Sequence, residues 1–259
     1  MILPFDAVGE GPVVVLLHAG IADRTMWRDH LVPIADSGRR AVALDLPGFG
    51  EAGLEPGPQS PWEDVLQTLR AVSGEPVALA GNSYGGAIAL RVAALAPAAV
   101  SALALISAPA PGADEEPSEE LAAVWEAEEM ALEDGDIEQA VTAVVEGWTL
   151  PGATDELRER IAAMQRRAFL LQQATPDAEL APDPLEDRLD RLTEMRVPTL
   201  CTAGTRDKPD FVEGAKQMAE ALPAGRHATI SRAGHLAPLE QPRVFRRQLL
   251  GFLDEVEGR

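Results

Sequence analysis

Cysteine is almost absent from this chain, since Cys201 is the only one among 259 residues. A single cysteine excludes an internal disulfide and a metal site built from several thiolates. Cys201 lies within the apolar run 197–203, so we interpret it as a small buried hydrophobic residue.

Long hydrophobic runs are missing as well. The first residues lack the basic segment and apolar stretch of a secretory signal, and the apolar run 13–17 is too short to span a bilayer. We therefore expect no insertion into a membrane and a location in the reducing cytoplasm.

Positive charge is scarce. Lysine and arginine together number 22 against 42 acidic residues, which gives a formal net charge of -20, and Lys208 and Lys216 are the only lysines. A negative field of this size opposes binding to phosphate backbones and to anionic membrane surfaces. The composition therefore predicts no nucleic-acid partner and no membrane partner, and it leaves the oligomeric state open.

What the chain does contain is a series of short apolar runs separated by helical patterns. The runs cover residues 13–17, 41–46, 77–80, 102–106, 199–203 and 227–231, and helical patterns cover 26–35, 61–72, 84–95, 212–222 and 242–256. This alternation predicts an α/β fold in which helices cover both faces of a mostly parallel sheet.

The alternation is interrupted once, after Ser107. Prolines and acidic residues follow up to Pro117, and two helical stripes with no strand between them then cover residues 137–148 and 157–171. We predict a helical cap over residues 112–190, inserted into a core made of residues 1–111 and 191–259. Residues 175–184, which hold three prolines, are the expected return linker.

A serine stands at the bend between one apolar run and the next helix, in Gly81-Asn82-Ser83-Tyr84-Gly85. A turn this sharp forces the serine backbone into a sparsely populated conformation and brings the residues two before and two after it close together. Glycine at both places avoids a clash, and the helix N-terminus points free N–H groups toward any anion that forms beside Ser83. Ser83 is therefore the candidate nucleophile.

A serine hydroxyl needs an adjacent base, and histidine has the matching pKa. Of the four histidines, His235 is the one in a loop just after a predicted strand, on the sheet edge that also carries Ser83. The third member is a carboxylate that orients the imidazole. Asp207 follows the preceding strand directly and is the candidate, with Asp210 as its competitor.

Acyl transfer also requires donors for the oxyanion that develops in the transition state. We expect the backbone N–H groups of Tyr84 and of Gly20, in the loop after the first core strand, to supply them. His18, at the start of that loop, is interpreted as a structural brace.

The order Ser83, Asp207, His235 is that of the α/β-hydrolase arrangement. The resemblance becomes specific through the segments 17–20 with Trp27 beyond, 45–50, 81–86, 204–207, 234–236 and 240–242. Together they identify the chain as similar to the α/β-hydrolase superfamily, in particular to small cap-bearing hydrolases of the enol-lactonase and carboxylesterase type. The resemblance implies an eight-stranded, mostly parallel sheet with one antiparallel strand, and no cofactor or metal.

Two places depart from the pattern of that superfamily. Ala19 stands where glycine is usual, which affects the oxyanion loop, and the N-terminal hairpin must be shortened, with residues 3–8 as its remaining strand.

We expect hydrolysis of a small carboxylic ester or lactone through an acyl-enzyme on Ser83. The alternatives are cleavage of a carbon–carbon bond or acyl transfer on the same triad, and sensing of a small ligand with little turnover. An apolar cap within an acidic shell predicts small or medium, largely apolar acyl groups.

The cap supplies the candidates for contact with the substrate. Some are apolar residues that either line the pocket or form the core of the cap: Trp125, Met130, Trp148, Met164 and Phe169. Four arginines either hold a substrate carboxylate or pair with neighbouring acids: Arg158, Arg160, Arg166 and Arg167.

Overall fold

The computed structural model describes residues 1–111, 117–186 and 190–258. Its centre is a seven-stranded sheet in the order β1-β3-β2-β5-β6-β8-β9, in which β1 pairs antiparallel with β3 and the other neighbours pair parallel. The strands are β1 (Phe5–Val8), β2 (Val13–Leu17), β3 (Arg40–Leu44), β5 (Val77–Asn82), β6 (Val100–Ile106), β8 (Thr199–Gly204) and β9 (Gly225–Ile230). The predicted α/β class is confirmed.

The expected count of eight strands is wrong for the main sheet, which has seven among the described residues. The N-terminal hairpin is reduced to β1 alone, and residues 1–4 before it form no strand. One antiparallel strand of four residues therefore borders β3.

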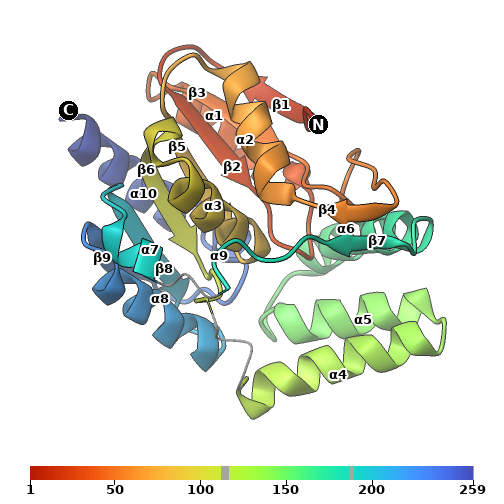
Figure 1. Ribbon diagram of the computed structural model, residues 1–259. Helices are drawn as coiled ribbons and strands as arrows, with labels where there is room; N and C mark the ends of the chain where they lie inside the picture. The colour runs from red at the N-terminus through yellow and green to blue at the C-terminus, as the bar shows by residue number, and fades with distance from the viewer. Residues whose placement is uncertain (112–116, 187–189, 259) are drawn as a thin grey trace.

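Helices cover both faces of the sheet (Figure 1). Alternate residues of each buried strand face opposite sides. In β2, Val14 and Leu16 belong to the core under α1 and α10, whereas Val15 belongs to the core under α2, α3 and α8. These helices are α1 (Arg28–Ala35), α2 (Pro61–Val72), α3 (Tyr84–Leu95), α8 (Pro209–Ala221) and α10 (Pro242–Glu257), and shorter turns are η1 (Arg24–Trp27), η2 (Pro97–Ala99), α7 (Asp190–Glu194) and α9 (Ala237–Glu240).

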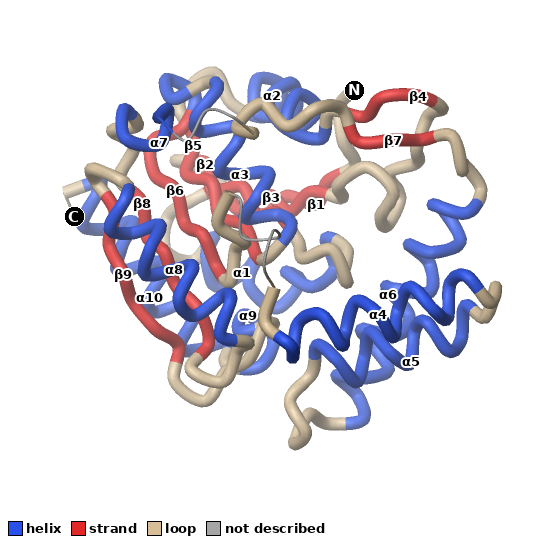
Figure 2. Tube along the Cα trace, turned by 60° about the horizontal axis from the view of Figure 1, so that its bottom comes forward, coloured by secondary structure: helices blue, strands red, loops and turns tan. Residues whose placement is uncertain are grey.

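Three longer helices lie between β6 and β8 in the chain and gather beyond one end of the main sheet (Figure 2). They are α4 (Glu119–Glu133), α5 (Ile137–Trp148) and α6 (Asp155–Gln173). Their buried faces join the core under α1 and α10, through Val144 of α5 and Ile161 of α6 among others. The division into a core and a cap with boundaries at 112 and 190 stays a prediction, and residues 112–116 and 187–189 lie outside the described residues.

A second, two-stranded sheet joins two distant segments. β4 (Gly57–Gln59) pairs parallel with β7 (Ala178–Leu180), so that Gln59 lies opposite Leu180. β7 falls within the predicted return linker, and the pair ties the segment after α6 to the loop that precedes α2.

None of the helices in the described ranges is both long and apolar enough to cross a membrane.

Candidate active site

Ser83 lies at a strained elbow between β5 and α3. Its backbone has φ 52° and ψ -119°, a region that side chains rarely adopt. A Cβ on Gly81 would lie 2.2 Å from the carbonyl oxygen of Gly85, and a Cβ on Gly85 would lie 2.4 Å from that of His18. The two glycines therefore allow the turn and bring it against the end of β2.

The structure brings His235 and Asp207 together. The imidazole Nδ1 lies 3.0 Å from one carboxylate oxygen of Asp207 and 3.2 Å from the other, and both side chains are almost fully buried. Asp207 follows β8 and His235 follows β9, so neighbouring parallel strands present the two groups at one edge of the sheet. Within the described part of the chain, no direct hydrogen bond joins the Ser83 hydroxyl to the imidazole. Catalytic hydrogen bonds are often long in an enzyme without its substrate.

Asp210, the competing carboxylate, has a different partner. Its two oxygens accept hydrogen bonds from the backbone N–H and the hydroxyl of Ser118, at 2.8 and 2.6 Å. Ser118 is the N-cap of α4. Asp210 thus holds the start of α4, and the carboxylate that meets the imidazole is that of Asp207.

Asn82 connects the serine elbow to the loop of the base, a role that the sequence reasoning missed. The Asn82 side-chain amide is fully buried and donates to the carbonyl oxygens of Ile106 and His235, each at 3.1 Å. The same Ile106 carbonyl accepts the N–H of Ser83 at 2.8 Å. The signal in the sequence was a polar residue, the only asparagine of the chain, inside an otherwise apolar strand.

Aromatic rings and a buried lysine surround His235. The rings of Trp148 and Phe211 each have their centroid 4.3 Å from that of the imidazole. The ammonium of Lys208 lies 4.2 Å from the Trp148 ring centroid and donates to the carbonyl oxygen of Gly147 at 2.6 Å. Burial lowers the pKa of Lys208. The loop that carries Asp207 therefore also holds the C-terminal end of α5, next to His235.

The loop after β2 is fixed from within by His18. The His18 Nδ1–H donates to the carbonyl oxygen of Ala19 at 2.8 Å, and its Nε2 accepts the N–H of Leu46 at 2.9 Å, which requires a neutral ring. Burial lowers the pKa of His18 and favours that neutral form. His18 is thus the brace that the sequence predicts. Gly20 lies against the residue after the serine, because a Cβ on Gly20 would be 3.4 Å from that of Tyr84.

A pocket of about 330 Å³ opens beside Gly20 and Tyr84. Its other walls come from the loop after β3, the β4–β7 pair, the start of α2 and the end of α6, and they consist of Pro47, Phe49, Leu54, Gln59, Pro61, Gln172, Ala178, Glu179 and Leu180. Its volume is at the lower end of the range found for small-molecule sites.

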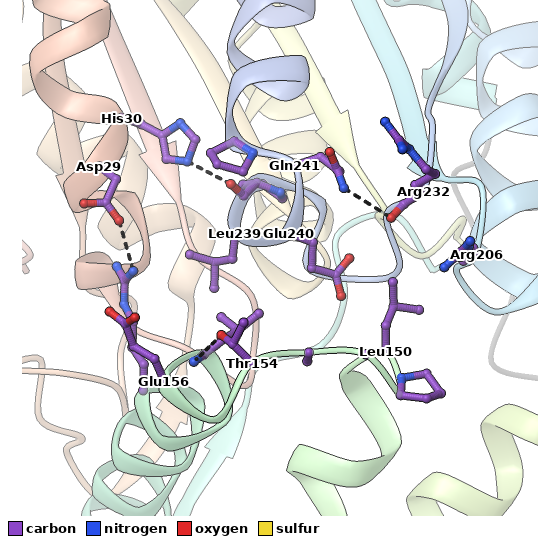
Figure 3. Close-up of a pocket in the computed structure, with 17 residues that line it drawn as sticks. Asp29, His30, Leu150, Thr154, Glu156, Arg206, Arg232, Leu239, Glu240 and Gln241 are labelled. Carbon is purple, nitrogen blue, oxygen red and sulfur yellow. Dashed lines mark hydrogen bonds and ion pairs between the residues drawn. The ribbon is translucent and has the colours of Figure 1, made fainter.

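A larger pocket of about 730 Å³ lies between α1, α9 and the start of α6 (Figure 3). Glu240 faces Thr154 and Leu150 across it, and the Glu240 carboxylate accepts the N–H of Gly234. Burial raises the pKa of Glu240. None of the candidate catalytic residues lines this pocket, and neither oxyanion residue does, so its size does not make it the reaction site.

The structure places the five apolar candidates of the cap differently. Trp148 contacts His235, while Met164 and Phe169 are buried in the core that α5 and α6 share with the sheet. Met130 is 54% exposed, and Trp125 lines a shallow groove on α4 with acidic neighbours. Thus Trp148 reaches the triad, and the described contacts do not bring Trp125 or Met130 to it.

Three of the four cap arginines have protein partners. Arg166 makes two bonds to the Glu138 carboxylate, Arg160 contacts Asp29, and Arg158 donates to the carbonyl oxygen of Leu150. The structure supports the pairing interpretation for the first two. None of the four lines the pocket beside Gly20, whereas Arg160 lines the larger one.

No group of three or more metal-ligating side chains occurs in the described ranges. Cys201 is buried, and burial raises the pKa of its thiol to about 12, in agreement with its interpretation as a core residue.

Comparisons with known proteins agree with this fold. A model of the alpha/beta hydrolase family matches residues 14–248. The chain is 30% identical to a 2-hydroxy-6-oxo-2,4-heptadienoate hydrolase of Pseudomonas putida, over 95% of this chain and 90% of that protein. It is also 30% identical to the polyketide synthase ThaQ of Burkholderia thailandensis, but there it spans 12% of the relative's length.

A solved structure of a thermophilic esterase from Thermogutta terrifontis superposes with a TM-score of 0.81. It is 25% identical, and the match covers 98% of this chain and 93% of the esterase. The family model, the curated relatives and the shared fold lead to one conclusion: the chain belongs to the alpha/beta hydrolase family.

Proposed function

We propose that the protein is a serine hydrolase that cleaves a small carboxylic ester or lactone through an acyl-enzyme on Ser83. The observation that carries this proposal is the joint placement of three groups. Ser83 lies on a strained elbow. The His235 Nδ1 lies 3.0 Å from a carboxylate oxygen of Asp207, which orients the imidazole, and the Asn82 amide bonds the elbow to the His235 loop.

In the first half-reaction the Ser83 oxygen attacks the acyl carbonyl carbon while His235 Nε2 takes the hydroxyl proton. Asp207 holds the imidazole through Nδ1–H and stabilises the imidazolium that forms. The Gly20 and Tyr84 N–H groups donate to the oxyanion, a contribution on the order of 3 kcal/mol for each well-placed donor. The tetrahedral intermediate then expels the alcohol oxygen, which receives the proton from His235.

In the second half-reaction water takes the place of the alcohol. His235 removes a proton from the water, the water oxygen bonds to the acyl carbon, and the Ser83 oxygen leaves with the proton returned. With a lactone, the alcohol and the acid remain in one product molecule. Neither step draws on a metal or a cofactor.

The test is release of p-nitrophenol from short p-nitrophenyl esters by the wild type and by Ser83→Ala. We expect the activity to be lost in Ser83→Ala and kept in Ser101→Ala, since Ser101 is an exposed serine on β6. Equal, slow hydrolysis by the wild type and Ser83→Ala would contradict the proposal. It would favour the alternative hypothesis that the protein senses a small ligand with little turnover.

A second candidate is hydrolysis of a carbon–carbon bond in a 2-hydroxy-6-oxodienoate, because the relative from Pseudomonas putida is a 2-hydroxy-6-oxo-2,4-heptadienoate hydrolase. The same triad also supports acyl transfer to an acceptor other than water. Turnover of a 2-hydroxy-6-oxodienoate that exceeds turnover of every ester offered would favour this candidate. Cytoplasmic location and a small-molecule partner stay predictions.

A further inference from the structure

The pocket beside Gly20 and Tyr84 has walls from three separate parts of the chain. The loop after β3 supplies Phe49 and Leu54, β4 supplies Gln59, and β7 supplies Leu180. Because Gly20 and Tyr84, the proposed oxyanion donors, both line it, a group in this pocket lies beside the place where Ser83 would attack the carbonyl. This placement suits the acyl part of a substrate.

The pocket is chemically suited to an uncharged chain. Carbon surfaces of prolines, Phe49, Leu54 and Leu180 make most of its wall. The two glutamine amides in the wall are turned to backbone oxygens: Gln59 donates to Glu55 and Gly57, and Gln172 donates to Gly48.

Its charge discriminates against an acidic chain. Glu179 is the one charged residue among the described residues that line the pocket, and none of them is an arginine or a lysine. A carboxylate entering the pocket would lose hydration without gaining a cation, in a region where the nearby charge is negative.

We infer that the acyl-binding site is this pocket between the oxyanion loop and the β4–β7 pair, that it takes neutral, apolar acyl groups, and that Leu54 and Leu180 set their length. The inference rests on the proposed function. Specificity for the length of the acyl group would then depend on the small sheet in which residues 57–59 pair with residues 178–180.

The test compares p-nitrophenyl acetate with the butyrate, hexanoate and octanoate, using the ratio of kcat/KM for each ester to that for acetate. Leu180→Trp fills the pocket from β7. For each methylene of the acyl chain that the larger side chain keeps out of the pocket, we expect the kcat/KM ratio to fall about fourfold. Leu54→Ala enlarges the pocket and raises the ratio for octanoate. Leu170→Trp is the matched control, since Leu170 is 55% exposed on α6 and does not line the pocket.

A second arm tests charge. The mono-p-nitrophenyl ester of succinic acid has a carboxylate where the uncharged butyrate has a methyl group, and we expect at least tenfold lower kcat/KM for the charged ester. Glu179→Gln should reduce the difference in kcat/KM between the charged and the uncharged ester.

The two proposals fail in different ways. Ester hydrolysis by Ser83→Ala at the rate of the wild type would overturn the serine mechanism. Activity that depends on Ser83, but with the same chain-length ratios in Leu180→Trp and Leu170→Trp or with a preference for the succinate ester, would overturn the assignment of the acyl pocket alone.

Discussion

Replacing Asn82 with leucine tests how the fold holds the nucleophile and the base in register. Leucine has a similar volume but cannot donate to the carbonyl oxygens of His235 and Ile106. The Asn82 Oδ1 has no partner among the described residues, so the variant loses two donated bonds and nothing else.

The cost can be worked out from those two bonds. The His235 carbonyl is left without its donor inside the protein, which costs about 1–3 kcal/mol. The Ile106 carbonyl keeps the Ser83 N–H, so that bond accounts for about 0.5–1.5 kcal/mol. The sum is roughly 1.5–4.5 kcal/mol, or a fall in Tm of roughly 3–18 °C. Freed from the elbow, the His235 loop shifts, and a shift of about 1 Å lowers kcat/KM on the order of 100-fold.

Urea unfolding and p-nitrophenyl ester hydrolysis measure the two effects. Gln165→Leu is the control, because Gln165 is also a buried amide with an unpartnered Oε1, but within the described ranges its side chain makes no hydrogen bond like the two that Asn82 donates. It should keep both stability and kcat/KM close to wild type. If Asn82→Leu behaved like this control in both assays, the bridge between the elbow and the base would not matter and the reasoning would be refuted.

Three further predictions concern single groups. Asp207→Asn should keep the Tm within a few degrees but lower kcat by about 10⁴-fold, since the amide favours the wrong tautomer of His235; activity within tenfold of wild type would reject Asp207 as the orienting acid. Burial, and next the charge of Arg246, lower the pKa of His30 from 6.5 to about 4. The unfolded chain therefore binds the proton first, so about 3 kcal/mol of stability present above pH 6.5 is lost as the pH falls toward 4. Urea unfolding across that range should show a smaller loss in His30→Gln, and equal losses would contradict the assignment. The thiol of Cys201, with its pKa raised to about 12, should react with iodoacetamide only when the protein unfolds, and rapid labelling of the folded protein would show that Cys201 is accessible.

The sheet and its covering helices could be predicted from the sequence because their patterns are local. Residues 61–72 and 84–95 form α2 and α3 with the predicted bounds. Both have apolar residues at helical spacing, and a proline marks the start of α2 while Pro97 follows the end of α3. The cap stripe at 137–148 likewise became α5. β3 begins one residue earlier than predicted, at Arg40, and β9 begins two residues earlier, at Gly225, because these residues continue the pairing outside the apolar runs.

Other elements were missed because their cause is not local. α4 buries Leu121 and Ala131 among many acidic residues, so its apolar stripe is weak. β4 and β7 are three residues each and exist because they pair with one another across the chain, which no local pattern reveals. The pocket that they border could not be predicted either, because its walls come from segments that are distant in the sequence.

The pairing of Asp207 with His235 could be predicted for the opposite reason. Both residues follow parallel strands, and the carboxyl ends of such strands share an edge of the sheet, where the imidazole Nδ1 lies 3.0 Å from an Asp207 carboxylate oxygen. The Asn82 bridge depends on a side-chain amide that reaches between two loops, and its two partners are distant in sequence.

The measurement that tests the central claim most directly is a search for the acyl-enzyme itself. The wild type and Ser83→Ala are mixed with p-nitrophenyl butyrate, quenched in acid while turnover continues, digested, and analysed by peptide mass spectrometry. The account predicts one butyryl group on the peptide that contains Ser83, formed with a burst of p-nitrophenol and absent from Ser83→Ala. Butyryl groups found elsewhere at the same level in both proteins, or rapid turnover with no acylated Ser83 peptide, would contradict it.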